Sequence, residues 1–399
     1  MNVAQKNIKK LYFIAACTGI VFYYAIDKVF MQARGLSLTE MVIIEIIYGA
    51  IVVLTEVPSG ALSDRWSRKY VLALNSLFFA LNTIIWAISH SFWLFVLGVV
   101  FGALHSAFQS GTNTSLLYDS LREMGRESQY ARYLGKTRAV TAVAFVLAAL
   151  VGGAVGQRFG TEATFWWTLP FTLLAGFTAL SLYEPRFHRS TGEVSYWKHI
   201  SKTLNYFVVN PKIVHMAIIL IAITIPALLF DEYAQLYFSF VGVSIFGLGV
   251  LAAINGGIDA IFNTFAHKLA RFRHDVLFSV CLVIMGLGFM VAGTLSNTIG
   301  ILILLIGGSA FFIVAILAES DINAQLPSSI RATSESFFSL AEKLVYIPIA
   351  LVFAWAGQHY SIATAFTWLG VAVLMYLLVF LIFSRKHVKQ VGEQNHQPY

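Results

Sequence analysis

Twelve long apolar stretches restrict the fold of this chain more than any other feature of its sequence. Each is about 20 residues or longer, the length that an α-helix needs to cross a lipid bilayer. Because backbone polar groups find no water inside lipid, helices are the expected form of these stretches. They cover residues 11–33, 40–62, 70–89, 92–117, 136–157, 164–183, 213–239, 245–267, 276–295, 299–318, 332–357 and 361–383.

The composition also indicates a membrane protein. Charged residues make up 12% of the 399 residues and hydrophobic residues 58%, whereas a soluble domain carries about 25% charged residues. The mean hydropathy is +0.74. We therefore expect an all-α membrane protein with twelve transmembrane helices and the lipid bilayer as its main surroundings.

Lysine and arginine are concentrated in alternate loops. They precede the first stretch and follow the second, fourth, sixth, eighth and twelfth, while the other loops hold little beyond Arg34 and Arg158. Since cytoplasmic loops carry an excess of Lys and Arg, both termini are expected in the cytoplasm and the protein in the cytoplasmic (inner) membrane. The net charge of +7 is dispersed over separate loops, so it indicates topology and not binding to nucleic acid.

A polar segment in the middle of the chain separates two halves of six apolar stretches each. Acidic residues recur about 203 residues apart, with Asp27 opposite Asp231 and Glu56 opposite Asp259. Such a repeat predicts two six-helix bundles related by pseudo-two-fold symmetry, as in transporters that expose one site alternately to each side. The expected organisation is an N-terminal bundle, a cytoplasmic linker, a C-terminal bundle and a cytoplasmic tail, at residues 1–183, 184–211, 212–384 and 385–399.

The short loop between the second and third stretches has a distinctive sequence. From Glu56 to Lys69 it reads Glu-Val-Pro-Ser-Gly-Ala-Leu-Ser-Asp-Arg-Trp-Ser-Arg-Lys. It resembles the signature loop between helices 2 and 3 of the major facilitator superfamily, whose pattern is Gly-x-Leu-x-Asp-Arg-x-Gly-Arg-Lys. The matching residues are Gly60, Leu62, Asp64, Arg65, Arg68 and Lys69, and Ser67 replaces the usual glycine.

The resemblance implies a secondary transporter in which this loop locks the cytoplasmic side shut. The gating residues are then Gly60, Asp64, Arg65, Arg68 and Lys69, with Asp119 as the partner of an arginine. A carboxylate can also interact with the positive end of a nearby helix, and arginines pair with acids. The alternative is a solvated loop that only sets the topology.

Shorter segments are similar to prokaryotic members of the superfamily often described as drug exporters. They are Ser110-Gly111-Thr112, the run from Leu116 to Leu121, Asn323, Pro327 and Arg331-Ala332-Thr333. The chain departs from many proton–drug antiporters by having Gly98 in place of an arginine and no Gly-Pro pair in the fifth stretch. Gly152 and Gly156 still place small residues one turn apart, which allows two helices to approach closely.

Polar and ionisable side chains inside the apolar stretches are the candidates for proton coupling or substrate binding. An unpaired charge at the bilayer centre costs roughly 2.5–3.5 kcal/mol, so such residues are rare and often functional. The candidates are Asp27, Glu45, His105, Gln109, Asp231, Glu232, Asp259 and Lys343; His105 and Gln109 share one helical face. The alternative is ion pairs that only hold helices together, such as Asp27 with Lys28, whose long side chain could extend outward to water.

The sequence contains no feature that indicates an enzyme. It lacks a phosphate-binding Gly-x-x-x-x-Gly-Lys run, a nucleophile elbow and a metal-ligand cluster, and no cofactor is expected. The expected function is proton-coupled efflux of a small amphipathic organic molecule by a monomer that works by alternating access. The alternatives are a proton symporter or uniporter of an organic anion, with Lys343 as counter-charge, and a non-transporting membrane receptor or scaffold.

Overall fold

The computed structural model of the chain describes residues 3–109, 112–184, 210–269, 274–312, 317 and 331–394, and every regular element in this part is helical. The first helices are α1 (Val3–Gly19), α2 (Asp27–Ala33), α3 (Leu38–Arg65), α4 (Arg68–Ile88), α5 (Phe92–Gln109), α6 (Thr112–Glu123), η1 (Glu127–Gln129, a 3-10 turn), α7 (Tyr130–Phe159) and α8 (Thr161–Leu180). The later helices are α10 (Pro211–Phe240), α11 (Ile245–Leu269), α12 (His274–Leu295), α13 (Thr298–Ser309), α15 (Arg331–His359) and α16 (Ile362–Gln394).

Ten helical segments within the described residues are long and apolar enough to cross a membrane. They account for ten of the twelve predicted stretches, and the stretch at 299–318 begins with the shorter apolar helix α13. The stretch at 11–33 forms two helices, α1 and α2, separated by residues 20–26. The prediction of an all-α membrane protein is therefore confirmed, but the expectation of one unbroken helix over residues 11–33 is wrong.

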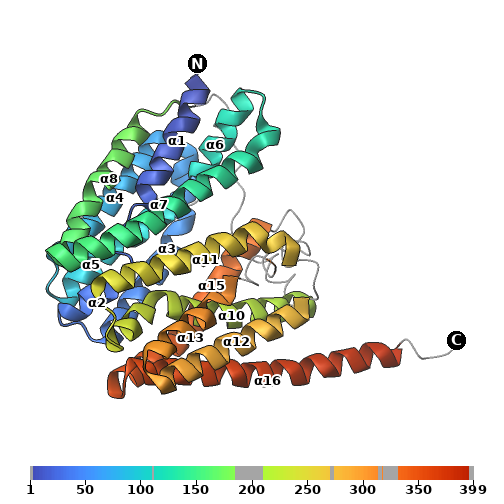
Figure 1. Cartoon of the computed structure of the whole chain (residues 1–399). Helices are drawn as coiled ribbons and strands as arrows, with labels where there is room; N and C mark the ends of the chain where they lie inside the picture. The colour runs from blue at the N-terminus through green and yellow to red at the C-terminus, as the bar shows by residue number, and fades with distance from the viewer. Residues whose placement is uncertain are drawn as a thin grey trace. The chain divides into compact units, whose positions relative to one another are not determined.

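The chain forms two compact units. The first comprises Met1–Ser195 and Gly242–Ala260, and the second comprises Tyr196–Val241 and Ile261–Tyr399. Both units are bundles of helices, coloured along the chain in Figure 1. The predicted boundaries of the two bundles, the linker and the tail stay predictions.

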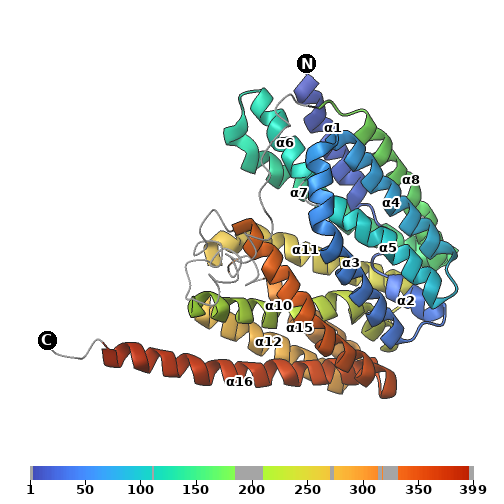
Figure 2. The same cartoon turned by 180° about the vertical axis from the view of Figure 1, so that it is seen from behind.

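In the first unit, α4 packs against α5 and α8, and α1 packs against α7 and α8. The start of α1 and helix α6 lie at one end of this unit, and α2 lies at the opposite end (Figures 1 and 2). At the N-terminal end, Asn7 of α1 donates to Ser120 Oγ (3.2 Å) and to the carbonyl oxygen of Tyr183 (2.7 Å), and its own oxygen accepts from the Tyr183 amide (2.9 Å). One buried amide thus joins three segments of the unit.

Tertiary contacts hold the interruption between α1 and α2 in place. The Phe22 amide, which has left the helical pattern, donates to Thr168 Oγ1 of α8 (3.1 Å). Gly152 of α7 packs directly on this segment, because a Cβ added there would overlap the carbonyl oxygen of Phe22. A Cβ at Gly156 would meet the side chain of Ile26 at 2.9 Å. Gly152 and Gly156 thus allow a close approach, but it brings the non-helical segment 20–26 against α7, whereas the sequence predicted the approach of two helices.

The second unit has an aromatic core. Phe366 of α16 lies 5.2 Å from Phe353 of α15, 5.7 Å from Phe289 of α12 and 5.8 Å from Tyr237 of α10, measured between ring centroids. The Tyr237 hydroxyl donates to the carbonyl oxygen of Ala292 (2.7 Å), so the polar end of this buried ring is satisfied. These rings fix four helices around one centre.

Candidate functional site

Two ionisable residues begin the short helix α2, directly after the interruption. Lys28 is 1% exposed and Asp27 is 8% exposed. The Lys28 amide donates to Asp27 Oδ1 (2.9 Å) and its ammonium group donates to Asp27 Oδ2 (3.1 Å). The Lys28 side chain therefore lies in the protein interior, so the alternative that it extends outward to water is wrong.

Glu45 of α3 brings a second carboxylate to the same ammonium group. Lys28 Nζ lies 2.7 Å from Glu45 Oε1, and the two side chains are 2% and 16% exposed. The start of α3 is fixed by Ser37, whose amide and hydroxyl both donate to Glu40 Oε2 (2.8 and 2.7 Å) as in a capping box. Two turns of helix then carry Glu45 to Lys28. We call Asp27, Lys28 and Glu45 the ion cluster.

The charge of the ion cluster sets what it can do chemically. With all three groups ionised, two carboxylates and one ammonium leave one net negative charge. Binding one proton to either carboxylate makes the cluster neutral, while the other carboxylate still pairs with Lys28. Buried charges are stable only when paired and hydrogen-bonded, and this arrangement keeps an ion pair in both protonation states. The cluster is therefore suited to binding and releasing one proton.

Aromatic side chains surround the ion cluster. The Tyr23 ring stacks on Phe165 with centroids 4.2 Å apart and an interplanar angle of 9°. Tyr23 also hydrogen-bonds Thr83 and lies close enough to Asp27, Lys28 and Tyr48 to interact with them electrostatically. Small-molecule sites are typically apolar walls with a few placed polar groups, and this region has that character.

Sequence reasoning did not single out Tyr48 or Thr83. Tyr48 follows Glu45 by three residues on α3, so it lies on the same helical face. That spacing was a usable signal for Tyr48. No sequence signal pointed to Thr83 of α4, because its hydrogen bond with Tyr23 depends on where the interrupted segment places Tyr23.

The other ionisable candidates lie outside the ion cluster. Asp231 of α10 is exposed, whereas its counterpart in the repeat, Asp27, is buried. Glu232 of α10, Asp259 of α11 and Lys343 of α15 are half-buried. Asp27 and Asp231 thus occupy different surroundings despite their matched positions in sequence.

His105 joins two helices of the first unit. Its ring stacks on Phe79 of α4, with centroids 4.6 Å apart. Its Nδ1 lies 3.2 Å from the carbonyl oxygen of Asn75, and the Asn75 side chain donates to the carbonyl oxygen of His105 (2.6 Å). In this structure His105 therefore packs α4 against α5. Gln109, one turn later on α5, is half-buried.

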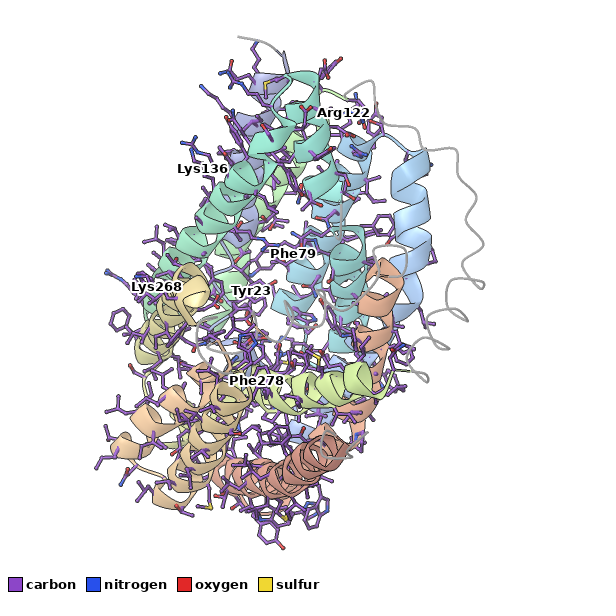
Figure 3. The ribbon with its side chains drawn as sticks, turned by 90° about the vertical axis from the view of Figure 1, so that its right-hand side faces the viewer. Tyr23, Phe79, Arg122, Lys136, Lys268 and Phe278 are labelled. Carbon is purple, nitrogen blue, oxygen red and sulfur yellow. The ribbon has the colours of Figure 1, made fainter. Side chains whose placement is uncertain are left out.

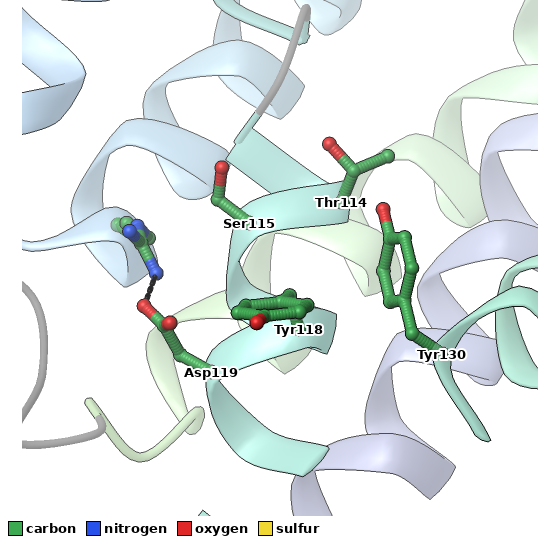
Figure 4. A pocket seen from close by; sticks show the side chains of 6 residues that line it. Thr114, Ser115, Tyr118, Asp119 and Tyr130 are labelled. Atoms are coloured by element: carbon green, nitrogen blue, oxygen red, sulfur yellow. Dashed lines mark hydrogen bonds and ion pairs between the residues drawn. The ribbon is translucent and has the colours of Figure 1, made fainter. Parts of the chain in front are cut away.

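A second ion pair lies near the start of α4. Arg68 pairs with Asp119 of α6, and the two side chains are 11% and 10% exposed. The pair lines a pocket of about 280 Å³ together with Thr114, Ser115, Tyr118 and Tyr130. Figure 4 shows these residues, with a dashed line from Asp119 to its partner. The pairing of Asp119 with an arginine, expected from the sequence, is present.

The remaining residues of the signature loop are described only in part. Ser67 donates to Glu184 Oε2 (2.7 Å), and Lys69 Nζ lies 4.9 Å from the centre of the Tyr70 ring. The side chains at positions 60–65, which include Gly60, Asp64 and Arg65, lie outside the described residues. In the part of the chain that the structure describes, no group of three or more His, Cys, Asp or Glu side chains could hold a metal ion.

Figure 3 shows how these regions are ordered along the first unit. Arg122 of α6 lies at the N-terminal end, Phe79 lies nearer the middle, and Tyr23 lies farther still from that end. The Arg68–Asp119 pair, which joins α4 to α6, and the ion cluster, which follows Tyr23, are therefore at different depths of the unit.

Comparison with known proteins identifies the family. Residues 11–350 match the profile of the Major Facilitator Superfamily. The chain belongs to this superfamily. It is accordingly a multi-pass membrane protein of a superfamily of secondary transporters.

The curated relatives are distant or match over short regions. The chain is 32% identical over 120 residues to an uncharacterized transporter of Buchnera aphidicola, covering 30% of this chain and 29% of that protein. It is 32% identical over 123 residues to the inner membrane transport protein YajR of Escherichia coli, covering 30% and 25%. A longer match, 20% identical over 308 residues, covers 76% of this chain and 78% of an uncharacterized MFS-type transporter of Methanocaldococcus jannaschii. The alignments with the first two relatives thus span less than a third of each.

Solved structures of the superfamily share the fold. The nucleoside transporter NupG aligns with a TM-score of 0.75 at 14% identity, covering 96% of this chain and 99% of NupG. A D-xylose–proton symporter aligns with a TM-score of 0.71 at 15% identity, covering 93% and 97%. At these identities the likeness shows the fold alone.

Proposed function

We propose that the protein exports a small amphipathic organic molecule in exchange for protons, by alternating access. The observation that carries this proposal is the ion cluster, in which the buried carboxylate of Asp27 and the half-buried carboxylate of Glu45 both pair with the ammonium group of Lys28. A structural ion pair needs one carboxylate for one ammonium. The second carboxylate adds a further ionisable group at membrane depth, where ionisable groups are costly and often functional, and a proton-binding role explains its presence.

Protonation of the ion cluster changes its charge by one unit, and this change can drive a conformational equilibrium. A ligand shifts such an equilibrium only when it binds the two states with different affinities. The charged cluster favours the state in which it is better solvated, and the neutral cluster tolerates the state in which it is more deeply enclosed. Proton binding on one side of the membrane and release on the other thereby couple the proton gradient to the cycle.

The surroundings of the ion cluster support an amphipathic substrate. Tyr23 presents a ring that contacts Phe165 and lies 6.4 Å from Trp86. The three rings are buried in this conformation, so a substrate would reach their apolar area, the phenol and the carboxylates only in another conformation of the transport cycle. A molecule with an apolar body and a polar or cationic group fits this chemistry.

We further propose that the Arg68–Asp119 pair belongs to a gate at the cytoplasmic end, together with Gly60, Asp64, Arg65 and Lys69. The pair joins α4 to α6 through nearly buried side chains. Because each charge compensates the other in poorly solvated surroundings, separating them has a cost. A pair of this kind can favour the conformation in which it is intact.

The location and orientation are part of the same proposal. We place the protein in the cytoplasmic membrane with both termini in the cytoplasm. In support, Arg122 and Lys136, which Figure 3 shows toward the N-terminal end of the first unit, are exposed basic residues, as are Arg126, Arg132 and Arg138 near them in sequence. A reporter that fluoresces only in the cytoplasm, fused to the C-terminus, should fluoresce; a dark but full-length fusion would place that terminus outside.

Transport by the purified protein in lipid vesicles tests the proposed function. Vesicles that are acidic inside should accumulate a solute from a panel of amphipathic organic molecules, because outward proton flow drives inward solute movement by antiport. Accumulation only in vesicles that are alkaline inside would indicate symport. If accumulation of every transported solute is independent of the pH gradient, proton coupling is wrong.

A further inference from the structure

Arg34 connects the C-terminal end of α2 to two other segments of the first unit. It caps the C-terminus of α2, where its amide bonds the carbonyl oxygens of Phe30 and Met31. Its Nη2 lies 2.6 Å from Glu162 Oε2 in the first turn of α8, and its Nη1 lies 2.7 Å from His90 Nδ1, between α4 and α5. The guanidinium also lies 4.9 Å from the centre of the Phe30 ring.

The link from α2 back to α1 is not helical, although it packs against α7 and α8. Residues 20–26 interrupt the helix, so α1 does not fix the direction of α2 through a continuous helical backbone. The seven residues of α2 span roughly 10 Å at 1.5 Å per residue. Asp27 and Lys28 begin this short rod and Arg34 follows its last residue. Any movement of the Arg34 end is therefore transmitted to the ion cluster.

The contacts of Arg34 with Glu162, His90 and Phe30 together fix the C-terminal end of α2, and we call them the anchor. A single half-exposed ion pair such as that with Glu162 contributes little by itself. Here the same guanidinium also contacts His90 and the ring of Phe30, and the Arg34 side chain is only 14% exposed. Phe30 in turn packs on Phe165, with centroids 4.7 Å apart. The anchor thus joins α2 to the start of α8 and to the turn before α5.

We propose that Arg34 is a positioning residue that holds Lys28 and Asp27 against Glu45 and so sets the proton affinity of the ion cluster. The contact between Lys28 and Glu45 spans two separate helices, so it depends on the placement of α2 against α3. When the anchor is lost, α2 shifts, the ammonium group moves away from Glu45, and that carboxylate binds a proton more readily. This inference rests on the proposed function for its consequence in transport, but not for the anchor itself.

Two measurements on the full-length protein in detergent test the inference without a known substrate. The first is hydrogen exchange of the α2 amides by mass spectrometry. The second is the pH dependence of modification by dicyclohexylcarbodiimide, which adds a protonated carboxyl across one C=N bond and rearranges to a stable N-acylurea. Modified peptides that contain Glu45 or Asp27 report the protonation of each.

Arg34→Gln and Glu162→Gln should both increase amide exchange in α2. Both should also move the pH of half-modification of Glu45 upward by about half a unit, which is about threefold in proton affinity. The charge-swapped pair Arg34→Glu with Glu162→Arg should restore much of each property. Arg158→Gln is the matched control, because Arg158 is an exposed arginine near the end of α7 whose guanidinium lies 5.7 Å from the centre of the neighbouring Phe159 ring.

Each outcome decides a separate claim. Unchanged α2 exchange in Arg34→Gln and Glu162→Gln would overturn the anchor. Faster exchange with an unchanged Glu45 profile would overturn the positioning role. If both measurements shift as expected but transport ignores the pH gradient, the anchor stands and the proposed function fails. Should Arg34→Gln fail to fold, Glu162→Gln and the swapped pair decide the question by the same readouts.

Discussion

Lys28 Nζ of α2 lies 2.7 Å from Glu45 Oε1 of α3, so one buried ammonium group joins two helices and also pairs with its neighbour Asp27. This contact makes Lys28 the centre of the candidate proton site. The two carboxylates come close to Lys28 in different ways. Asp27 precedes Lys28 in the sequence, whereas Glu45 lies on another helix and is brought to Lys28 by the packing of α3 against α2. Because both depend on the same cation, changes to either are expected to alter the protonation of the other.

Replacement of Lys28 by Met should destabilise the protein strongly. It leaves Asp27 and Glu45 without the cation that they share, and breaking a buried ion pair in this way costs about 3–5 kcal/mol. The apparent melting temperature in detergent should fall. Adding Asp27→Asn and Glu45→Gln removes the uncompensated charges and should recover most of the melting temperature, but not proton coupling. Recovery of both would show that the ion cluster is structural.

Gly152→Ala should weaken the packing of α7 on the interrupted segment. The new Cβ overlaps the carbonyl oxygen of Phe22, and overpacking of this kind typically costs about 1–3 kcal/mol. Gly135→Ala on the same helix is the control, because a Cβ there meets nothing within 4 Å. The melting temperature should fall for the first variant and stay level or rise slightly for the second. Equal melting temperatures would contradict the tight packing at Gly152.

Asn7→Ala should lower stability by about 1–3 kcal/mol, because it leaves the Tyr183 amide and carbonyl without their partner. Gln5→Ala, an exposed position on the same helix, should have little effect. The melting temperatures of both variants can be measured by thermal unfolding, followed with a fluorescent dye that does not react with thiols. A loss at Gln5 as large as the loss at Asn7 would mean that α1 tolerates no change at this end.

Asp119→Asn should reduce transport about fivefold or more by removing the charge that holds Arg68, in line with the usual size of conformational coupling. Binding of solute should change much less. The exchanged pair Arg68→Asp with Asp119→Arg should regain part of the rate, and Arg126→Gln, an exposed residue nearby in sequence, should behave as the parent. Full transport by Asp119→Asn would exclude the pair from the gate.

Much of the fold was predictable because hydrophobic stretches of bilayer length have few alternatives to a helix. The pairing of Asp119 with an arginine was also accessible, since both belong to loops that the family pattern brings together. The interruption at residues 20–26 was not. That segment is apolar and lacks proline, and its shape depends on contacts of Phe22 with Thr168 and Gly152, which only the folded unit provides.

The composition of the ion cluster was predictable only in part. Asp27 and Glu45 stood out as acids at membrane depth, and the adjacency of Asp27 to Lys28 suggested a pair. The burial of Lys28 was left open, because a lysine near a helix end ordinarily extends toward water. Here the interruption turns α2 so that Lys28 is buried and faces Glu45. Side-chain direction after a break in a helix cannot be read from helical periodicity.

Proton movement during solute transport tests the central claim most directly. Vesicles that contain the purified protein and a trapped pH dye should change internal pH when a transported solute is added. Asp27→Asn and Glu45→Gln should exchange solute without this change, whereas Glu40→Gln, which keeps an acceptor for Ser37, should behave as the parent. If the variant that combines Asp27→Asn with Glu45→Gln moves protons with solute as fast as the parent, the ion cluster is not the proton site.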